Sequence, residues 1–305
     1  MVQSLGRGLV GLLLITIIGC SGEEDELMNM ESTDDLNILA DNFKVYVSDA
    51  GNFDNPPWRI LQFDHQGENA TIFTEEELDW PQDILFLEER GEVLISNLNS
   101  GQINRHDATT GEYLGVFADD IAGPTRMKIG PDGLLYVLQW SGNGLALRFN
   151  LDGDFLDAFT DRGVSQSIGI DWDSENNLYI SSFDQKTVTK FDQEGKNQGV
   201  FIRSNLQGPT NIWFDGNNNL LVNDWQSGLI VKFDGSGEFI ENIATGLREV
   251  EGVAILESGG ILVGAGATST VKYIDETGSL IGDFIERRSG GLIRPNAIVI
   301  RQDSP

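Results

Sequence analysis

A short motif occurs six times between residues 63 and 275 of this 305-residue chain, at intervals of 41 to 43 residues. In each copy an aromatic or similarly bulky residue is followed by Asp or Asn and then by a turn that contains glycine. The copies begin at Phe63-Asp64, His106-Asp107, Phe149-Asn150, Phe191-Asp192, Phe233-Asp234 and Ile274-Asp275. A fixed period of this length indicates that one supersecondary unit is repeated around the molecule.

A second marker runs in phase with the first and precedes a short apolar run in each copy. Its members are Pro81, Pro124, Ser167, Pro209, Glu251 and Pro295. Each unit reads as four short runs separated by Gly, Asn and Asp, residues that reach the positive φ of tight hairpin turns. Antiparallel strands at this density and period are typical of a propeller blade. The sequence therefore predicts an all-β fold, a six-bladed β-propeller with four antiparallel strands in each blade.

The two ends of the repeat predict how the ring closes. Blade one begins at residues 43–48 without a proline-led first strand, whereas residues 294–300 form such a strand with no further strands after it. We expect the C-terminal strand to join the N-terminal blade, because this pairing hides two otherwise open sheet edges. The propeller domain is thus expected to span residues 43–305.

The repeat resembles the NHL and streptogramin-lyase-like family of six-bladed propellers over residues 43–301. The segments that carry the resemblance are Gly208-Pro209-Thr210-Asn211-Ile212, Leu220-Leu221-Val222 and Lys232-Phe233-Asp234, with their counterparts in the other blades. The resemblance implies the fold but no single activity, since such propellers include lyases, lactonases, ligand-binding proteins and scaffolds.

The first 19 residues are expected to be a lipoprotein signal peptide. Arg7 precedes an apolar stretch that is too short to span a bilayer comfortably, and Ile17-Ile18-Gly19-Cys20 resembles the lipobox of bacterial lipoproteins. Cys20 is the single cysteine of the chain and therefore the expected lipidation site. The alternative is an ordinary secretory peptide with an incidental cysteine. Residues 20–42 are rich in Asp and Glu, which predicts a flexible acidic tether.

These features predict a protein of the bacterial cell envelope that contacts the membrane through its lipid anchor alone. Ser21, directly after the cysteine, favours the outer membrane by resemblance to other lipoproteins. The formal charge of the chain is −28, which repels phosphate backbones, so nucleic acid is not an expected partner. The acidity suits cationic partners or divalent ions, although solubility is the simpler explanation.

A binding site is expected at the channel mouth, where the loops between blades and the loops after each second strand emerge together. A concave mouth with aromatic walls and a few polar groups is the usual place for a small ligand. The candidate ligand-binding residues are Asp49, Asp83, Asn97, Arg126, Gln139, Trp140, Phe183, Asn211, Asp224 and Trp225. Alternatively, the aromatic residues wedge between blades and the Asp and Asn residues cap turns. We expect Arg126 to pair with Asp83, as a structural bridge or as an anion-binding element.

A calcium site is the less favoured alternative. Residues 49–58 form an insertion rich in oxygen ligands, which is typical of calcium binding, of a lid or of a solvated loop. The candidate metal ligands are Asp49, Asn211, Asp224 and Asn296. Lactonases of the gluconolactonase type hold calcium one residue after the proline-like position, and at that position only Asn296 fits this resemblance.

The sequence favours binding over catalysis. The chain has two histidines, His65 and His106, and both are expected on the face opposite the mouth, away from any acid–base chemistry there. We therefore expect a non-enzymatic propeller that binds a small molecule, glycan or peptide. The alternatives are a scaffold for an envelope protein and a divalent-metal-dependent hydrolase or lactonase.

Overall fold

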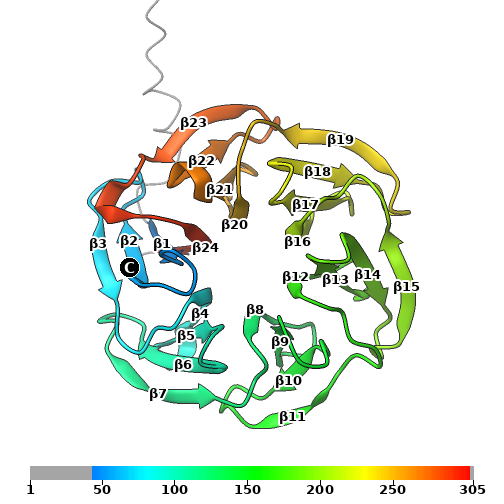
Figure 1. Cartoon of the computed structure of the whole chain (residues 1–305), viewed down its shortest axis with the longest axis horizontal. Helices are drawn as coiled ribbons and strands as arrows, with labels where there is room; N and C mark the ends of the chain where they lie inside the picture. Colours follow the sequence, from blue (N-terminus) through cyan, green and yellow to red (C-terminus); the bar gives the residue numbers. More distant parts are fainter. Residues whose placement is uncertain (1–42, 303–305) are drawn as a thin grey trace, which may run out of the picture.

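The computed structural model describes residues 43–302, so the predicted leader, Cys20 and the acidic tether lie outside the described residues. The described chain forms six antiparallel sheets of four strands each, arranged as a ring (Figure 1). This arrangement confirms the predicted six-bladed β-propeller. The elements are β1 (Phe43–Asp49), β2 (Arg59–Phe63), β3 (Thr71–Thr74), β4 (Pro81–Leu87), η2 (Glu88–Arg90), β5 (Glu92–Asn97), β6 (Gln102–Asp107), β7 (Tyr113–Ala118), β8 (Pro124–Ile129), β9 (Leu135–Gln139), β10 (Leu147–Phe149), β11 (Phe155–Ala158), β12 (Ser167–Trp172), β13 (Leu178–Ser182), β14 (Thr187–Phe191), β15 (Asn197–Ile202), β16 (Pro209–Phe214), β17 (Leu220–Asp224), β18 (Leu229–Phe233), β19 (Phe239–Ala244), β20 (Val250–Ile255), β21 (Ile261–Ala265), η3 (Gly266–Thr268), β22 (Thr270–Ile274), β23 (Leu280–Ile285), η4 (Ser289–Gly291) and β24 (Pro295–Gln302).

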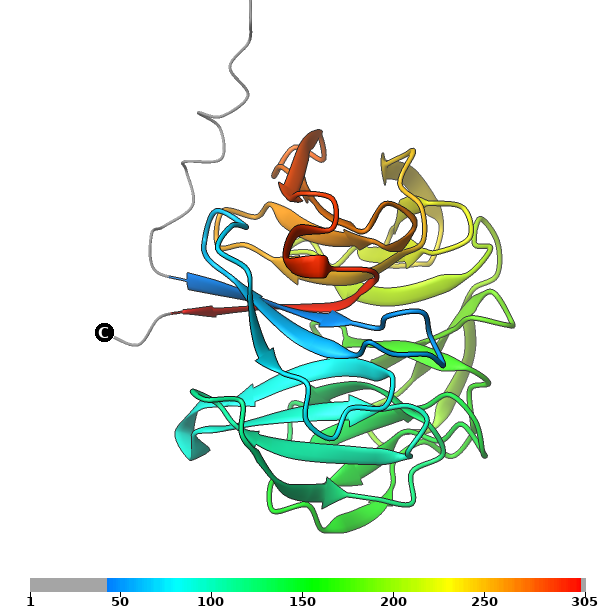
Figure 2. The ribbon, with the colours of Figure 1, turned by 60° about the vertical axis from the view of Figure 1, so that its left-hand side comes forward.

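Blade one is closed by the two ends of the described chain. Its strand order is β24-β1-β2-β3, and the antiparallel pairing of β1 with β24 runs from Phe43 opposite Gln302 to Ser48 opposite Ala297. Figure 2 shows the red final strand beside the blue first strand. The predicted ring closure is therefore confirmed. The other blades use consecutive strands, β4–β7, β8–β11, β12–β15, β16–β19 and β20–β23, which we number two to six.

The two residues of the repeated aromatic–Asp pair have different structural roles. The bulky residue is buried in every copy, as Phe63, Phe191 and Phe233 illustrate at 1% exposure or less. The Asp or Asn that follows accepts backbone N–H groups of the next turn; Asp64, for example, accepts from residues 66 and 68 over 3.0 and 2.9 Å. This is an Asx-type turn, in which the side chain replaces a backbone partner. The period in the sequence thus reports one core position and one turn cap in each blade.

The glycine of each repeated turn packs against the neighbouring blade. Gly67 has φ of +75°, and a Cβ placed there would lie 2.0 Å from the carbonyl oxygen of Phe284. Gly111 repeats this with φ of +76° and the carbonyl of Phe73 at the same distance. Any larger residue would therefore meet both backbone strain and a steric clash.

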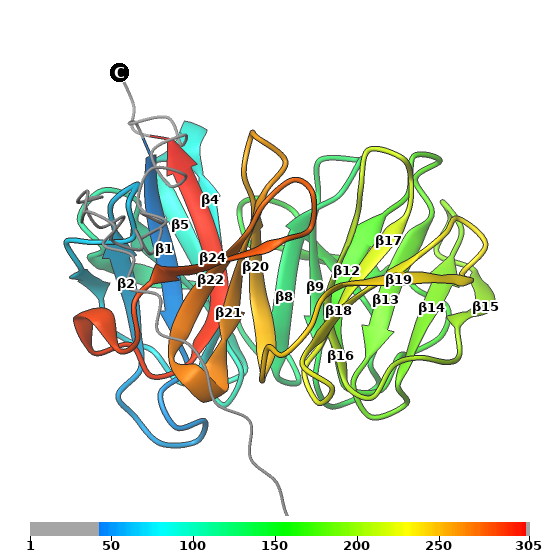
Figure 3. The same ribbon diagram turned by 90° about the horizontal axis from the view of Figure 1, so that it is seen from above.

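Apolar side chains of adjacent blades form the core between them. Leu94 and Ile103 of blade two, for example, belong to one buried cluster with Leu135, Val137 and Phe149 of blade three. Figure 3 shows the ring edge-on, with the blue loop after β1 projecting from one of its two faces. The packing holds the inner strands around a central axis, and the loops at their ends form the two mouths.

The predicted start of blade six is wrong by one residue. The prolines and Ser167 begin their inner strands as expected, but blade six begins at Val250, which pairs with Ala265 as Pro209 pairs with Asp224. Glu251 therefore corresponds to Gln82, Thr210 and Asn296 rather than to the prolines. Blade six has no proline at its start, so its register is not marked in the sequence. In the structure the acidic side chain of Glu251 reaches the channel.

Candidate functional site: an aromatic mouth above a buried arginine

A cavity of about 310 Å³ opens at the predicted mouth. Loops of blades one to five contribute an aromatic wall. Its members are Phe53, Trp80, Trp140, Phe183 and Trp225. We call this space the mouth cavity. Three of the predicted site residues, Trp140, Phe183 and Trp225, are thus brought together with Trp80 and with Phe53, which lies in the 49–58 insertion.

The aromatic wall consists of two groups of contacting rings. Trp140 and Phe183 have ring centroids 5.7 Å apart, and Phe183 and Trp225 have centroids 6.0 Å apart at an angle of 71°. On the other side Phe53 and Trp80 are 5.3 Å apart. Tilted and edge-to-face contacts of this kind stabilise aromatic pairs. Since all five rings are only half-buried, they bridge neighbouring loops and still present surface to the cavity.

The insertion in blade one forms part of this wall. Phe53 and Asp54 line the mouth cavity. The loop is held in place because Trp58 Nε1 donates to the Phe53 carbonyl over 2.8 Å and the Arg294 guanidinium lies 3.9 Å from the centre of the Phe53 ring. Trp58 therefore supports the site from outside the cavity. Of the three alternatives for this insertion, a calcium loop, a lid and a solvated loop, the arrangement is nearest to a lid, because Phe53 and Asp54 lie at the mouth cavity.

A single arginine lies beneath the mouth and joins five blades. Arg126 of blade three is 4% exposed. Its Nε donates to Asn211 Oδ1 over 2.7 Å, its Nη2 donates to Glu251 Oε1 over 3.0 Å and to the Asn296 carbonyl over 2.8 Å, and its Nη1 donates to the Gln82 carbonyl. The other four residues belong to blades one, two, five and six. Four hydrogen bonds from one guanidinium thus join these blades at the centre of the channel.

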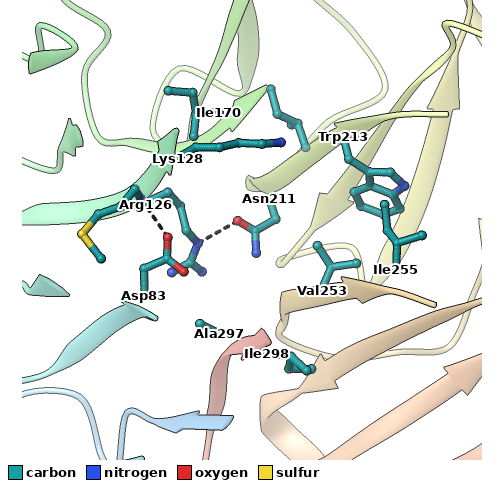
Figure 4. Close-up of a pocket in the computed structure, with 12 residues that line it drawn as sticks. Asp83, Arg126, Lys128, Ile170, Asn211, Trp213, Val253, Ile255, Ala297 and Ile298 are labelled. Atoms are coloured by element: carbon teal, nitrogen blue, oxygen red, sulfur yellow. Dashed lines mark hydrogen bonds between the residues drawn. The ribbon is translucent and has the colours of Figure 1, made fainter. Parts of the chain in front are cut away.

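The predicted pairing of Arg126 with Asp83 is wrong. The ion pair of Arg126 is with Glu251, at 3.0 Å. The Asp83 carboxylate instead accepts the backbone N–H of Met127 over 2.8 Å and that of Ile84 over 3.0 Å. Figure 4 shows Asp83 and Asn211 on either side of Arg126. Sequence reasoning missed Glu251 because of the register error in blade six.

Glu251, Asn296 and Gln82 form the polar floor of the mouth cavity together with Thr210. When the Asn296 amide nitrogen faces Glu251, it donates to the two carboxylate oxygens over 2.9 and 2.8 Å, and the amide oxygen accepts from Gln82 Nε2 over 3.2 Å. This orientation satisfies every partner, which is how amide orientations are assigned. Glu251, Asn296 and Gln82 are therefore connected by hydrogen bonds above Arg126, while the Thr210 hydroxyl bonds to the Val250 carbonyl.

Burial perturbs both carboxyls around Arg126. Burial raises the pKa of Glu251 and the pKa of Asp83, while the positive charge of Arg126 acts in the opposite direction on each. The net effect in both is a raised pKa, because desolvation penalises the ionised form. The channel centre thus holds two carboxyls around one guanidinium.

The raised pKa of Glu251 predicts a pH dependence of stability. A carboxyl with a raised pKa binds a proton more tightly in the folded state, so stability grows as the pH falls through that pKa toward the ordinary value of 4.5. We expect the free energy of unfolding of the wild type to rise relative to that of Glu251→Gln as the pH is lowered from about 7.5 to about 4.5. Urea denaturation of both proteins across this range measures the difference. A difference that instead favours the wild type at high pH would contradict the prediction.

Four other predicted ligand residues, Asp49, Asn97, Gln139 and Asp224, clamp loops instead of facing the mouth cavity. All are buried at the end of a second or equivalent strand. Their contacts run from Arg294 N to Asp49 (2.9 Å), from Asp79 N to Asn97 (3.0 Å), from Gln139 to the Leu145 carbonyl (2.7 Å) and from Gly208 N to Asp224 (2.7 Å). The contacts of Asp49, Asn97 and Asp224 are those of the alternative in which Asp and Asn hold turns, and Gln139 holds its loop in a similar way.

The four candidate metal ligands are held by different partners. Asp49 pairs with Arg59 at 2.7 Å, Asp224 binds loop backbone, and Asn211 and Asn296 belong to the network around Arg126. Within residues 43–302 there is no group of three or more His, Cys, Asp or Glu side chains that could hold a metal ion. In the register of the structure, Glu251 stands one residue after the start of its inner strand, which is the position where lactonases are expected to hold calcium. Its carboxylate contacts the guanidinium of Arg126.

Neither histidine lines the mouth cavity. His106 is fully buried at the far end of β6, its Nδ1 lies 3.2 Å from the Gly111 carbonyl, and burial lowers its pKa. The His65 ring meets Phe43 edge-on at 6.3 Å. Both histidines therefore lie beside hairpin turns, where they pack against the protein.

A second cavity of about 280 Å³ lies along the inner strands on the other side of Arg126. Asp83, Arg126 and Asn211 line it together with Lys128 and Trp213 (Figure 4). Lys128 pairs with Asp171 at 2.5 Å. We call this space the inner cavity. The charged side chains along it have protein partners, whereas the mouth cavity presents aromatic surface.

These features define a six-bladed β-propeller with an aromatic mouth above a hydrogen-bonded polar centre. No family model and no curated protein matches the chain. The structure is similar to one from a nidogen/laminin complex (TM-score 0.69, 16% identity, covering 85% of this chain and 98% of the other). It is also similar to a Bacteroides caccae protein of unknown function (TM-score 0.68, 15% identity, covering 85% of this chain and 98% of the other). A third similar structure is Staphylococcus aureus virginiamycin B lyase (TM-score 0.56, 15% identity, covering 78% of this chain and 87% of the other). At these identities the likeness shows the shared fold, which is that of the streptogramin-lyase-like propellers.

Proposed function

We propose that this propeller is a non-enzymatic binding protein whose mouth cavity takes a small molecule, or the end of a glycan or peptide. The observation that carries the proposal is the wall of five aromatic side chains around one cavity of about 310 Å³. A concave, mostly apolar site with a few polar groups at its base is the usual form of a small-ligand pocket. The network around Arg126 supports the site by holding five blades at a common centre.

The composition of the mouth favours binding over catalysis. A Staphylococcus aureus virginiamycin B lyase with a histidine replaced by alanine is catalytically inactive. In the present chain neither histidine lies at the mouth, and the carboxylate that lines its floor, Glu251, is bound by Arg126 and Asn296. A general acid or base needs a free proton position within reach of the substrate. The arrangement therefore supports recognition.

Trp140→Ala or Trp225→Ala is expected to weaken binding by about 1 to 3 kcal/mol, since each removes one aromatic contact with the ligand. A panel of sugars, peptides and small amines is first screened by thermal shift, because a ligand of the folded state raises its melting temperature. Affinities for the best ligand are then measured by calorimetry. Trp172→Ala is the matched control, because Trp172 lies at the far end of β12 against Tyr136, at 5.0 Å. Unchanged affinity in both mouth variants would mean that the mouth is not the site.

We further propose that the propeller is a lipid-anchored protein of the cell envelope. The support is the lipobox-like sequence that ends at Cys20. Within residues 43–302 no helix is long and apolar enough to cross a membrane. Metabolic labelling with palmitate should mark the wild type and fail to mark Cys20→Ser. Labelling of the variant would contradict the proposed anchor.

Protein binding through the rim is a second candidate function. Outer strands of several blades expose apolar side chains, namely Ile72, Leu114, Phe155, Leu156, Phe239, Ile240 and Leu280. Exposed apolar surface of this kind is one property of interaction sites. Cross-linking at the cell surface that depends on Phe155 and Phe239, and not on Trp225, would favour this candidate over the mouth.

A further inference from the structure

The charged residues that line the mouth cavity are all acidic. Among the described residues, 43–302, the cavity lining contains Asp54 and Glu251 and no Lys or Arg. Arg126 lies below, where it lines the inner cavity. A ligand in the mouth therefore meets carboxylates at the rim and at the floor.

The formal charges around Arg126 do not cancel when both neighbouring carboxyls are ionised. Within residues 43–302, Arg126 is the cation that pairs with Glu251, and Asp83 is a second, half-buried carboxyl whose pKa responds to the same guanidinium. The other charged groups that act on these two carboxyls belong to separate ion pairs, Lys128 with Asp171 at 2.5 Å and Arg294 with Glu249 at 3.0 Å. When both carboxyls are ionised, the centre carries one excess negative charge.

The aromatic wall has the same electrostatic preference. The face of an aromatic ring carries partial negative charge, and a cation within about 6 Å of its centre is attracted to it. Arg294 already lies this way over Phe53, at 3.9 Å from the ring centre. Trp80, Trp140, Phe183 and Trp225 supply further indole and phenyl surface around the same cavity. Indole is the strongest of these acceptors.

The polar groups of the floor already have partners in the protein. The Thr210 hydroxyl lies 3.0 Å from the Val250 carbonyl, the Asn296 amide nitrogen donates to Glu251, and the Asn296 amide oxygen accepts from the Gln82 amide. A sugar held here would need hydrogen-bond partners that these groups give to each other. An organic cation needs only ring faces and negative potential.

We propose that the mouth cavity binds an organic cation, an amine or quaternary ammonium group attached to a compact apolar body. This inference rests on the proposed binding function of the same cavity. The cationic head contacts the indole faces above Glu251, and the apolar body fills the space between the two groups of rings. The volume of about 310 Å³ restricts the ligand to a small one.

The test compares cations with neutral compounds of the same shape. The probes are choline with 3,3-dimethylbutan-1-ol, and benzyltrimethylammonium with neopentylbenzene; each neutral partner replaces the nitrogen by carbon. Binding to the detergent-purified full-length protein is followed by tryptophan fluorescence. In at least one pair we expect the cation to bind tenfold or more tightly than its neutral partner. Trp225→Leu should weaken the binding of both members.

Charge variants assign the preference to the carboxylates. Asp54→Asn changes an exposed rim residue outside the Arg126 network, and Glu251→Gln changes the floor. Each should weaken the binding of the cation several-fold more than that of its neutral partner. Glu194→Gln, an exposed acid on the opposite face, is the control and should change neither. If Glu251→Gln does not fold, Asp54→Asn still decides the point.

The outcomes separate this inference from the function on which it rests. Equal affinity for both members of each pair would overturn the cation preference and leave an apolar binding site. The cation preference is also overturned if no cation binds and a sugar or peptide binds instead, with an affinity that Trp140→Ala and Trp225→Ala reduce. The proposed binding function then stands. If no ligand of any class depends on those tryptophans, the proposed function itself fails.

Discussion

Ending the chain at Arg294 is expected to abolish the cooperative stability of the whole propeller. The truncation removes β24, which forms seven residue pairs with β1 and buries Pro295, Asn296, Ala297 and Ile298. It also removes Arg301, whose guanidinium pairs with Glu88 of blade two at 2.8 Å. Ladder hydrogen bonds contribute about 1 kcal/mol each, so the loss is on the order of 5 kcal/mol or more, comparable with the total stability of a typical domain.

Guanidinium denaturation followed by circular dichroism measures this effect. A chain that ends at Gln302 is the matched control, because it retains all of β24, and it should unfold as the full chain does. A synthetic peptide of residues 295–302 added to the truncated protein should recover part of the lost stability, since the vacated edge of β1 is its binding site. An unchanged unfolding midpoint in the truncated chain would show that ring closure does not stabilise the fold.

Arg126→Met is expected to lower the free energy of unfolding by about 3 to 5 kcal/mol, the cost of breaking a buried ion pair. The substitution leaves Glu251 buried without its cation and leaves the Gln82 and Asn296 carbonyls without a donor. It removes the single side chain that joins five blades. We therefore expect the loss to appear in the cooperative unfolding of the entire ring.

Two comparisons make this prediction specific to the burial of Arg126. The exposed pair of Arg90 with Asp152, at 2.9 Å, is the control, and Arg90→Met should cost no more than about 1 kcal/mol. The double variant Arg126→Met with Glu251→Met should be more stable than Arg126→Met alone, because it removes the uncompensated charge. Equal losses in Arg90→Met and Arg126→Met would show that the central network adds nothing to stability. Urea denaturation at neutral pH provides all of these values.

Much of the architecture could be predicted because it depends on neighbours in sequence. Asp64 caps its own turn through residues 66 and 68, and Phe63 beside it is a core position. Such short-range chemistry recurs in each blade and leaves a period that can be counted. Ring closure followed from the same period, since the segment before Arg301 matched the strand that blade one lacked. The aromatic positions after the second strands were visible for the same reason.

The site depends on contacts that no local pattern records. The partners of Arg126 lie 44, 85, 125 and 170 residues away along the chain. A shift of one residue in blade six hid Glu251, because a slip of one position moves every side chain of a strand to its other face. The sequence by itself determined the number of blades, the turn caps and the closure, since these arise within one repeat. Only the tertiary structure decided which side chains meet at the axis, because the ring brings together residues that are far apart along the chain.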